Sequence, residues 1–115
     1  MKRIGNIFET LCSMDNIQEA HRNARKGKRH YREVKMVDRD PDRYLSDLQA
    51  VLEAGEHKTA PYVELIRVCC NKTRKIAKLP YYPDRIVHHC IAQVLADVWQ
   101  KTLIRDTYAC IRGRG

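Results

Sequence analysis

Three cationic side chains, Lys72, Arg74 and Lys75, lie directly after Asn71, a residue typical of turns. A hairpin tip that carries several cations can bind a triphosphate or a backbone phosphate, because its strands hold the charges in place. The simpler alternative is a set of exposed charges that discourages pairing at a strand edge. The residue pattern alone favours this alternative, because most charge runs are solvated.

A zinc site is the next possibility, since His88, His89 and Cys90 are adjacent and Cys69 and Cys70 lie upstream. The spacing argues against it. Neighbouring histidines point in different directions on a helix, neither has a ligand one turn further on, and the chain has no Cys-x-x-Cys motif. We expect Cys90 to lie in the core and the chain to hold no metal.

No pattern in the sequence predicts catalysis. The chain lacks a Gly-x-Ser-x-Gly motif, and its cysteines and histidines match no protease pattern. Asp38, Asp40 and Asp42 are close enough in sequence to suggest a two-metal centre, but they surround an expected helix start, where Asp is favoured as a cap and by the helix dipole. We therefore expect structural carboxylates and no catalytic residue.

Two further basic segments could face phosphate. The first segment is followed by further cations and has no apolar periodicity, so we expect it to be solvated. The other is a glycine-rich C-terminal tail, too short to act as a nucleic-acid-binding tail by itself. The cations of the first are Arg25, Lys26, Lys28 and Arg29, and those of the second are Arg112 and Arg114.

The chain as a whole is basic. Its 115 residues include 22 Lys and Arg against 14 Asp and Glu, for a formal charge of +8. This excess favours a polyanionic partner. Charged residues interrupt every apolar stretch and the N-terminus is not a secretory signal, so we expect no membrane span and a cytoplasmic location. The odd number of cysteines, five, indicates reduced and mostly buried thiols.

Local signals predict an α+β fold, mainly α, with three helices and one β-hairpin. Asp15 is expected to cap a helix over residues 15–26. Asp40 as cap, Pro41 at the first position and Gly55 past the end predict a second helix over residues 41–54.

The β-hairpin is predicted over residues 62–79, where β-branched and aromatic residues precede a turn and a basic strand. Pro80 and Pro83 then exclude a helix locally, and Asp84 can cap a third helix over residues 84–100. The wide apolar face of this helix is the best core candidate.

The order of several blocks between Tyr31 and Gly115 resembles the opening part of bacterial reverse transcriptases, particularly those of diversity-generating retroelements and group II introns. The segment 71–76 is similar to the family's basic fingers hairpin. The most specific stretch is Leu79–His89, which resembles the LP-x-x-x-DR-x-V-x-H block at the start of a long fingers helix. The blocks at 31–55 and 103–115 are similar to its N-terminal extension and to its IRDSYA segment with the glycine-rich motif.

This resemblance implies that Lys72 and Arg74 clamp the triphosphate of the incoming deoxynucleotide, with Lys75 as the alternative if the register slips by one. Arg85 is expected either to contact the template or to form a salt bridge near Asp84. Arg112 and Arg114 are expected beside the path of the template or primer. The implied partners are an RNA template and an RNA–DNA hybrid.

The chain departs from the family in one respect. The palm aspartates that hold two magnesium ions for phosphoryl transfer are absent from this sequence. We therefore expect one partial domain without polymerase activity, either a shortened recombinant product or a truncated coding sequence. Residues 1–60 would form the N-terminal extension, residues 61–100 the fingers hairpin and helix, and residues 101–115 the start of the palm.

Two alternatives stay open. The chain could be a free-standing basic nucleic-acid-binding module, or an interaction domain of a phage-defence or intron-maturase system. In the fragment interpretation, the missing palm would leave apolar surface exposed, and the chain could self-associate to cover it.

Overall fold

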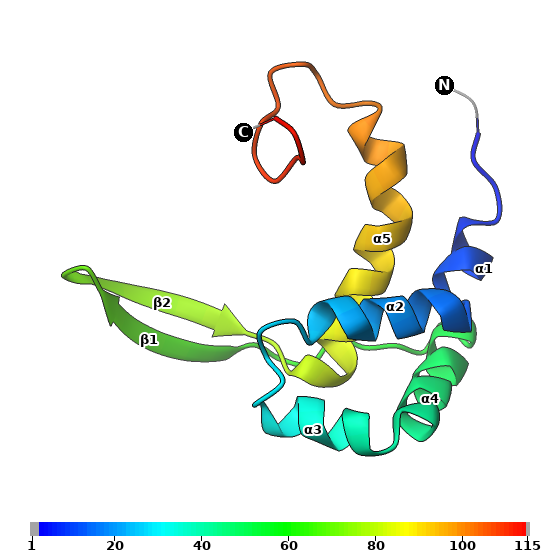
Figure 1. Cartoon of the computed structure of the whole chain (residues 1–115), viewed down its shortest axis with the longest axis horizontal. Coiled ribbons are helices and arrows are strands. Elements are labelled where there is room, and N and C mark those ends of the chain that lie inside the picture. The colour runs from blue at the N-terminus through cyan, green and yellow to red at the C-terminus, as the bar shows by residue number, and fades with distance from the viewer. Residues whose placement is uncertain (1–2, 115) are drawn as a thin grey trace.

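The computed structural model of the chain describes residues 3–114, which form five α-helices, four of them around a small core, and one β-hairpin that projects from the helices (Figure 1). The expected fold class, α+β and mainly helical, is confirmed. Two of the helices were not predicted. In chain order the elements are α1 (Ile7–Leu11), α2 (Met14–Ala24), α3 (Arg32–Arg39), α4 (Pro41–Glu53), β1 (Val63–Cys69), β2 (Lys72–Lys78), the kinked segment η1 (Tyr81–Arg85) and α5 (Ile86–Gln100).

Helices α2 and α4 form where local signals predicted them. The cap of α4 is Asp40, whose side chain accepts a hydrogen bond from the backbone N–H of Arg43 at 3.4 Å. The predicted cap of α2 is wrong. Ser13 caps this helix by accepting from the backbone N–H of Asn16 at 3.3 Å, and Asp15 lies in the first turn. A serine two residues earlier satisfies the same orphan donors.

Helix α3 begins inside the basic segment that we expected to be solvated, residues 25–35, so that expectation is wrong for residues 32–35. Val34 and Val37 are completely buried, while the cations around them are exposed. Two apolar residues three positions apart make a face wide enough for a helix of eight residues. The surrounding cations made this apolar spacing of Val34 and Val37 difficult to recognise in the sequence.

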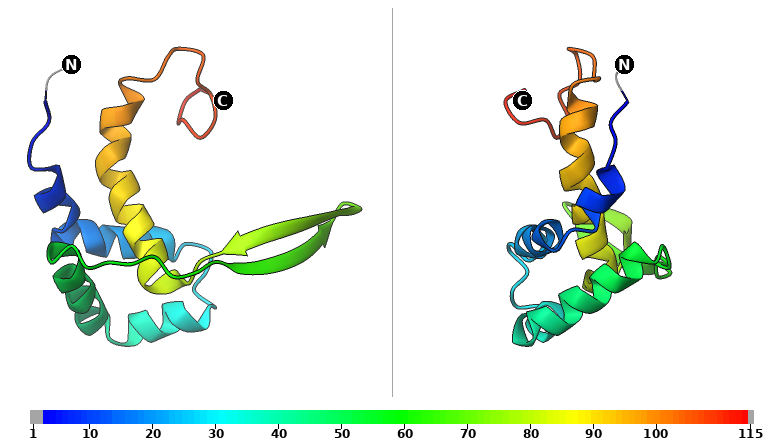
Figure 2. Two further views of the ribbon diagram at one scale, coloured as in Figure 1. Left: turned by 180° about the vertical axis from the view of Figure 1, so that it is seen from behind. Right: turned by 90° about the vertical axis from the view of Figure 1, so that its right-hand side faces the viewer.

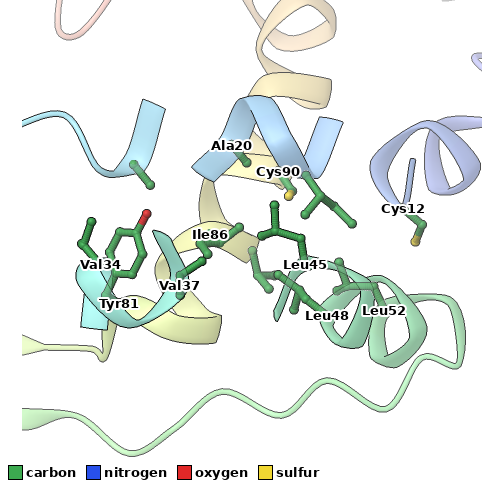
Figure 3. Packing of buried hydrophobic residues seen from close by; sticks show 13 residues of the cluster. Cys12, Ala20, Val34, Val37, Leu45, Leu48, Leu52, Tyr81, Ile86 and Cys90 are labelled. Atoms are coloured by element: carbon green, nitrogen blue, oxygen red, sulfur yellow. The ribbon is translucent and has the colours of Figure 1, made fainter. Parts of the chain in front are cut away.

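The core lies where α2, α3, α4 and the start of α5 meet, and Figure 3 shows their side chains converging. Only the first half of α5 contributes to it, so its predicted apolar face is buried in part. Trp99, near the end of α5, is 58% exposed. The buried apolar residues are Cys12, Ile17, Ala20, Ala24, Val34, Val37, Leu45, Leu48, Leu52, Tyr81, Ile86, Val87 and Cys90.

The segment η1 connects the hairpin to α5 and is not a regular helix. Tyr82 has extended backbone angles, φ −109° and ψ 130°, and the Tyr82–Pro83 peptide bond is cis. Asp84 does not cap α5 as predicted. It is fully buried, accepts a hydrogen bond from the backbone N–H of Ala60 at 3.3 Å and lies 3.4 Å from Nε2 of His57. Burial of this carboxylate anchors the loop before β1 to η1.

The hairpin stands apart from the helices. Figures 1 and 2 show no helix over either of its faces, and all fourteen strand residues are exposed. Its turn is Cys70-Asn71, both with positive φ (52° and 62°), so the turn includes Asn71, the residue typical of turns, and begins one residue before it. Within residues 3–114, no helix combines the length and the apolar character needed to cross a membrane.

Large apolar side chains are exposed on the hairpin and beyond α5. Ile66 and Val68 of β1 are 68% and 75% exposed, and Ile104 is 74% exposed. This is the surface on which the expected self-association would depend.

Candidate nucleic-acid interface

The register of the hairpin gathers cations on one face. Arg67 pairs with Arg74, Cys69 with Lys72, and Val63 with Lys78. Residues directly opposite each other in an antiparallel pair project to the same side, and side chains alternate along each strand. Arg67, Lys72, Arg74 and Lys78 therefore form one cationic face.

The opposite face of the hairpin carries charges of both signs. Lys75 pairs with Ile66 and projects there, together with the acidic Glu64 and the apolar Val68. Lys75 thus projects to the face opposite Lys72 and Arg74. Those two residues, which were predicted to act as a pair, share one face. Lys75 cannot replace either of them without a change of register.

A groove of about 580 Å³ lies at the base of the cationic face. Arg67 and Lys78 line it from the hairpin, and Arg85, His88 and His89 line it from η1 and the first turns of α5. We call it the basal groove. Tyr31, Tyr62, Leu65, Ile76, Ala77 and Leu79 complete its walls, so none of its lining residues is acidic.

A second cavity, of about 690 Å³, adjoins the basal groove and extends toward α3. The two share the lining residues Tyr31, Leu65, Lys78, Leu79 and Arg85. The second cavity also has an acidic lining residue, Glu33, but its carboxylate accepts hydrogen bonds from the backbone N–H groups of Tyr81 and Tyr82. Glu33 is therefore already paired with the chain.

Aromatic rings accompany the cations of the groove. The Nζ of Lys78 lies 5.2 Å from the centroid of the Tyr31 ring, within the range of a cation–π interaction. Tyr62 is 63% exposed. Cations that neutralise phosphates beside rings on which bases stack are the usual composition of a single-strand binding surface.

The positive charges around the groove affect the pKa of His89. Its pKa is lowered, first by burial and then by the positive charges of Arg85, Lys28 and His88. Two of the predicted contact residues, Lys28 and Arg85, are thus close enough to act on one imidazole. A bound phosphate would relieve this crowding of positive charge.

Of the two roles predicted for Arg85, a template contact or a salt bridge, the structure bears on the salt bridge. Among the residues that the structure describes, no carboxylate pairs with Arg85, and the buried Asp84 lies beside His57. The salt-bridge interpretation is therefore not supported. Arg85 lines both cavities, where its guanidinium is available to an anion.

The other predicted residues are dispersed. Arg25 donates a hydrogen bond to Asp38 at 3.0 Å, which also lies 2.7 Å from Nε2 of His21, so Arg25 has a structural partner. Lys26 and Arg29 are exposed in the connection between α2 and α3. They lie outside the set that lines the groove.

The C-terminal arginines also differ from each other. Arg112 is exposed, whereas the guanidinium of Arg114 donates to the backbone carbonyls of Ile104, Arg105 and Thr107 at 3.1, 3.4 and 3.3 Å. Arg114 therefore closes the C-terminal loop on itself. Its guanidinium would have to leave these carbonyls to reach a phosphate.

The cysteines correct another expectation. Cys12 and Cys90 are buried, but Cys69, Cys70 and Cys110 are exposed, so most of the thiols are not buried. Within residues 3–114, no three His, Cys, Asp or Glu side chains form a group that could hold a metal ion.

Sequence reasoning missed Arg67, Lys78 and Tyr31 as members of this surface. Arg67 and Lys78 could have been predicted, because the alternation of side chains along the paired strands puts both on the face of Arg74. Tyr31 gave no such signal, since it is far from the hairpin in sequence. No known protein family has a model that matches this chain, and no curated protein matches it.

Proposed function

We propose that this chain is the N-terminal portion of an RNA-directed DNA polymerase and binds the phosphates of an RNA template or RNA–DNA hybrid. One observation carries the proposal: four cations share one face of the hairpin, which leads into a groove without an acidic lining residue. Such a surface suits a polyanion.

The resemblance to reverse transcriptases supports the same surface. Its most specific block, Leu79–His89, is the link between the hairpin and α5, and it supplies Arg85, His88 and His89 to the groove. In this proposal Lys72 and Arg74, which share a face, bind the triphosphate of a deoxynucleotide. The catalytic aspartates and their magnesium belong to the rest of the parent enzyme, so the chain alone is inactive.

The test is the salt dependence of binding to a labelled RNA–DNA hybrid. Lys72→Ala/Arg74→Ala removes two cations from the cationic face, so the slope of log K against log[salt] should flatten by about 2. Fluorescence anisotropy at several salt concentrations gives this slope. Since both side chains are exposed on strands, the variant should keep its fold.

A matched control removes the same charge elsewhere. Lys58→Ala/Lys75→Ala deletes two exposed cations that lie off the cationic face. We expect its slope to change much less. Equal slopes for the two double variants would show that only net charge matters, and no binding by the wild type at low salt would rule out nucleic-acid binding by this chain.

A further inference from the structure

Two thiols lie side by side at the exposed tip of the hairpin. Cys69 ends β1, Cys70 begins the turn, and their Sγ atoms are 3.6 Å apart. Both residues are exposed. This dithiol lies outside the groove and is not used by the proposed function.

The spacing does not suit a direct disulfide. The Cα atoms of adjacent residues joined by a trans peptide are about 3.8 Å apart, whereas disulfides usually join Cα atoms at roughly 4.4–6.8 Å. The spacing does suit two sulfurs bound to one central atom. With sulfur bonds of about 2.3 Å, the length of a metal–thiolate bond, and an angle of about 100° at a pyramidal trivalent centre, two ligands lie about 3.5 Å apart, close to the separation seen here.

We propose that Cys69 and Cys70 form a bidentate binding site for a thiophilic trivalent centre, of which a monosubstituted arsenical is the representative. Such a centre already carries one carbon substituent and needs two sulfur ligands. Zinc in a structural site needs four ligands, which this tip does not provide. Thiolates are the soft ligands that select soft ions.

The reaction balances without an oxidant. Phenylarsine oxide loses its As–O bond, each thiol loses its proton to that oxygen, two As–S bonds form and one water is released. Arsenic stays trivalent and neither sulfur is oxidised. The product is a small ring closed through Cys69, Cys70 and arsenic.

The other three thiols of the chain could also bind the arsenical. Cys110 is a single exposed thiol, and Cys12 and Cys90 are buried, the pKa of Cys90 being raised to about 12 first by burial and then by Cys12. A single thiol can hold the arsenical only through one bond. Closing the second bond within the molecule strengthens binding by about 100-fold or more.

The experiment treats the folded 115-residue chain with phenylarsine oxide, and mass spectrometry counts adducts after a wash with a monothiol. We expect one adduct per chain that survives millimolar mercaptoethanol and is removed by a dithiol such as dithiothreitol. Cys69→Ser and Cys70→Ser should each lower retention by about 100-fold, since one thiol remains. Cys110→Ser should retain the adduct fully.

Two results would overturn the proposal. An adduct that survives the monothiol in Cys69→Ser/Cys70→Ser would assign the binding to the buried pair. An adduct that the monothiol removes from the wild type would show that the tip binds through one thiol only. Circular dichroism of each variant establishes that the fold is intact, which is expected because both substituted side chains are exposed.

Discussion

At the scale of single residues, His89 is the most informative group in the basal groove. Burial, and after it the charges of Arg85, Lys28 and His88, lower its pKa, so the imidazole is neutral near pH 7. An anion bound in the groove would favour the imidazolium. Binding and protonation of His89 should therefore be coupled.

We expect the affinity for the RNA–DNA hybrid to rise as the pH falls through and below about 6.5, the ordinary pKa of histidine. The gain should be roughly tenfold at most, the value of one charge-assisted contact. His89→Gln should remove most of this dependence, and anisotropy titrations from pH 8 to 5.5 measure it. His30→Gln, at an exposed histidine that does not line the groove, should behave as the wild type.

The lowered pKa has the opposite effect on folding. Protonation of His89 in the free protein opposes folding, so stability falls as the pH drops below about 6.5. Far-ultraviolet circular dichroism at each pH therefore accompanies the titration. Identical pH dependence of binding in His89→Gln and the wild type would contradict the coupling.

A second residue-scale network joins α2, α3 and η1. His21 is buried between Asp38, 2.7 Å from its Nε2, and the hydroxyl of Tyr81, 2.8 Å from its Nδ1. Burial alone would raise the pKa of Asp38, but its hydrogen bonds with His21 and Arg25 and their charges outweigh this and lower it. The ionised carboxylate thus stabilises the fold.

Asp38→Asn should destabilise the protein at pH 7 by about 1 kcal/mol, because His21 and Arg25 lose their charged partner. A lowered carboxyl pKa contributes stability above the unfolded value of about 3.9, and this stability is lost as the pH falls through the folded value. The difference between wild type and variant should therefore shrink below about pH 4. Urea unfolding across the pH range measures it.

The control for this network is Asp97→Asn, which changes an exposed carboxylate on α5. Its stability should stay within about 0.5 kcal/mol of the wild type. A destabilisation by Asp38→Asn that is equal at pH 3 and pH 7 would mean that the charge of Asp38 is not what stabilises the network.

At the scale of elements, α3 is held by burial more than by helix propensity. Its eight residues are too few for a stable helix in isolation, and its cations face solvent. Val34 and Val37 reach the core from its inner face. The carboxylate of Glu33 on the same helix accepts from the backbone of η1, so α3 also positions the segment that leads to α5.

Val34→Ala should destabilise the protein by roughly 2 kcal/mol, because it removes two buried methyl groups and leaves a cavity. Met36→Ala changes the same helix at its exposed side, where 36% of Met36 is accessible, and should cost less than about 0.5 kcal/mol. Chemical denaturation of both variants makes the comparison. Similar losses for the two would mean that α3 is not anchored through its buried face.

At the scale of the whole molecule, the hairpin and the helical core are unequal in stability. The core joins four helices, while the hairpin packs mainly on itself and exposes all of its strand residues. A two-stranded hairpin without a covering layer is only marginally stable in water. The hairpin projects from the helical core, so it can open without disturbing the packing of the helices (Figures 1 and 2).

We expect hydrogen exchange to separate the two parts. Amides of residues 63–78 should be less protected by on the order of 100-fold than amides of α2 and the first turns of α5, because local opening of the hairpin does not require the core to unfold. Mass spectrometry after pulse labelling measures this difference. Saturating RNA–DNA hybrid should raise the protection of residues 63–78, whereas equal protection of hairpin and core without the hybrid would contradict the separation.

Elements bounded by local signals could be predicted from the sequence alone. The α4 helix depends on Asp40, Pro41 and Gly55, which act within one turn of its ends, and the hairpin depends on strand-forming residues around a turn. The pairing of Lys72 with Arg74 on one face follows from the alternation along a strand. These features need no contact with distant parts of the chain.

The tertiary structure alone decided the rest, because the groups concerned are far apart in sequence. Tyr31, Lys78 and Arg85 meet in the basal groove only because α3, the hairpin and η1 pack around one core. Asp84 is a buried partner of His57 instead of a helix cap, since the loop before β1 returns to cover it. Local propensity cannot encode these contacts, whose free energy comes from burial and charge in the folded chain.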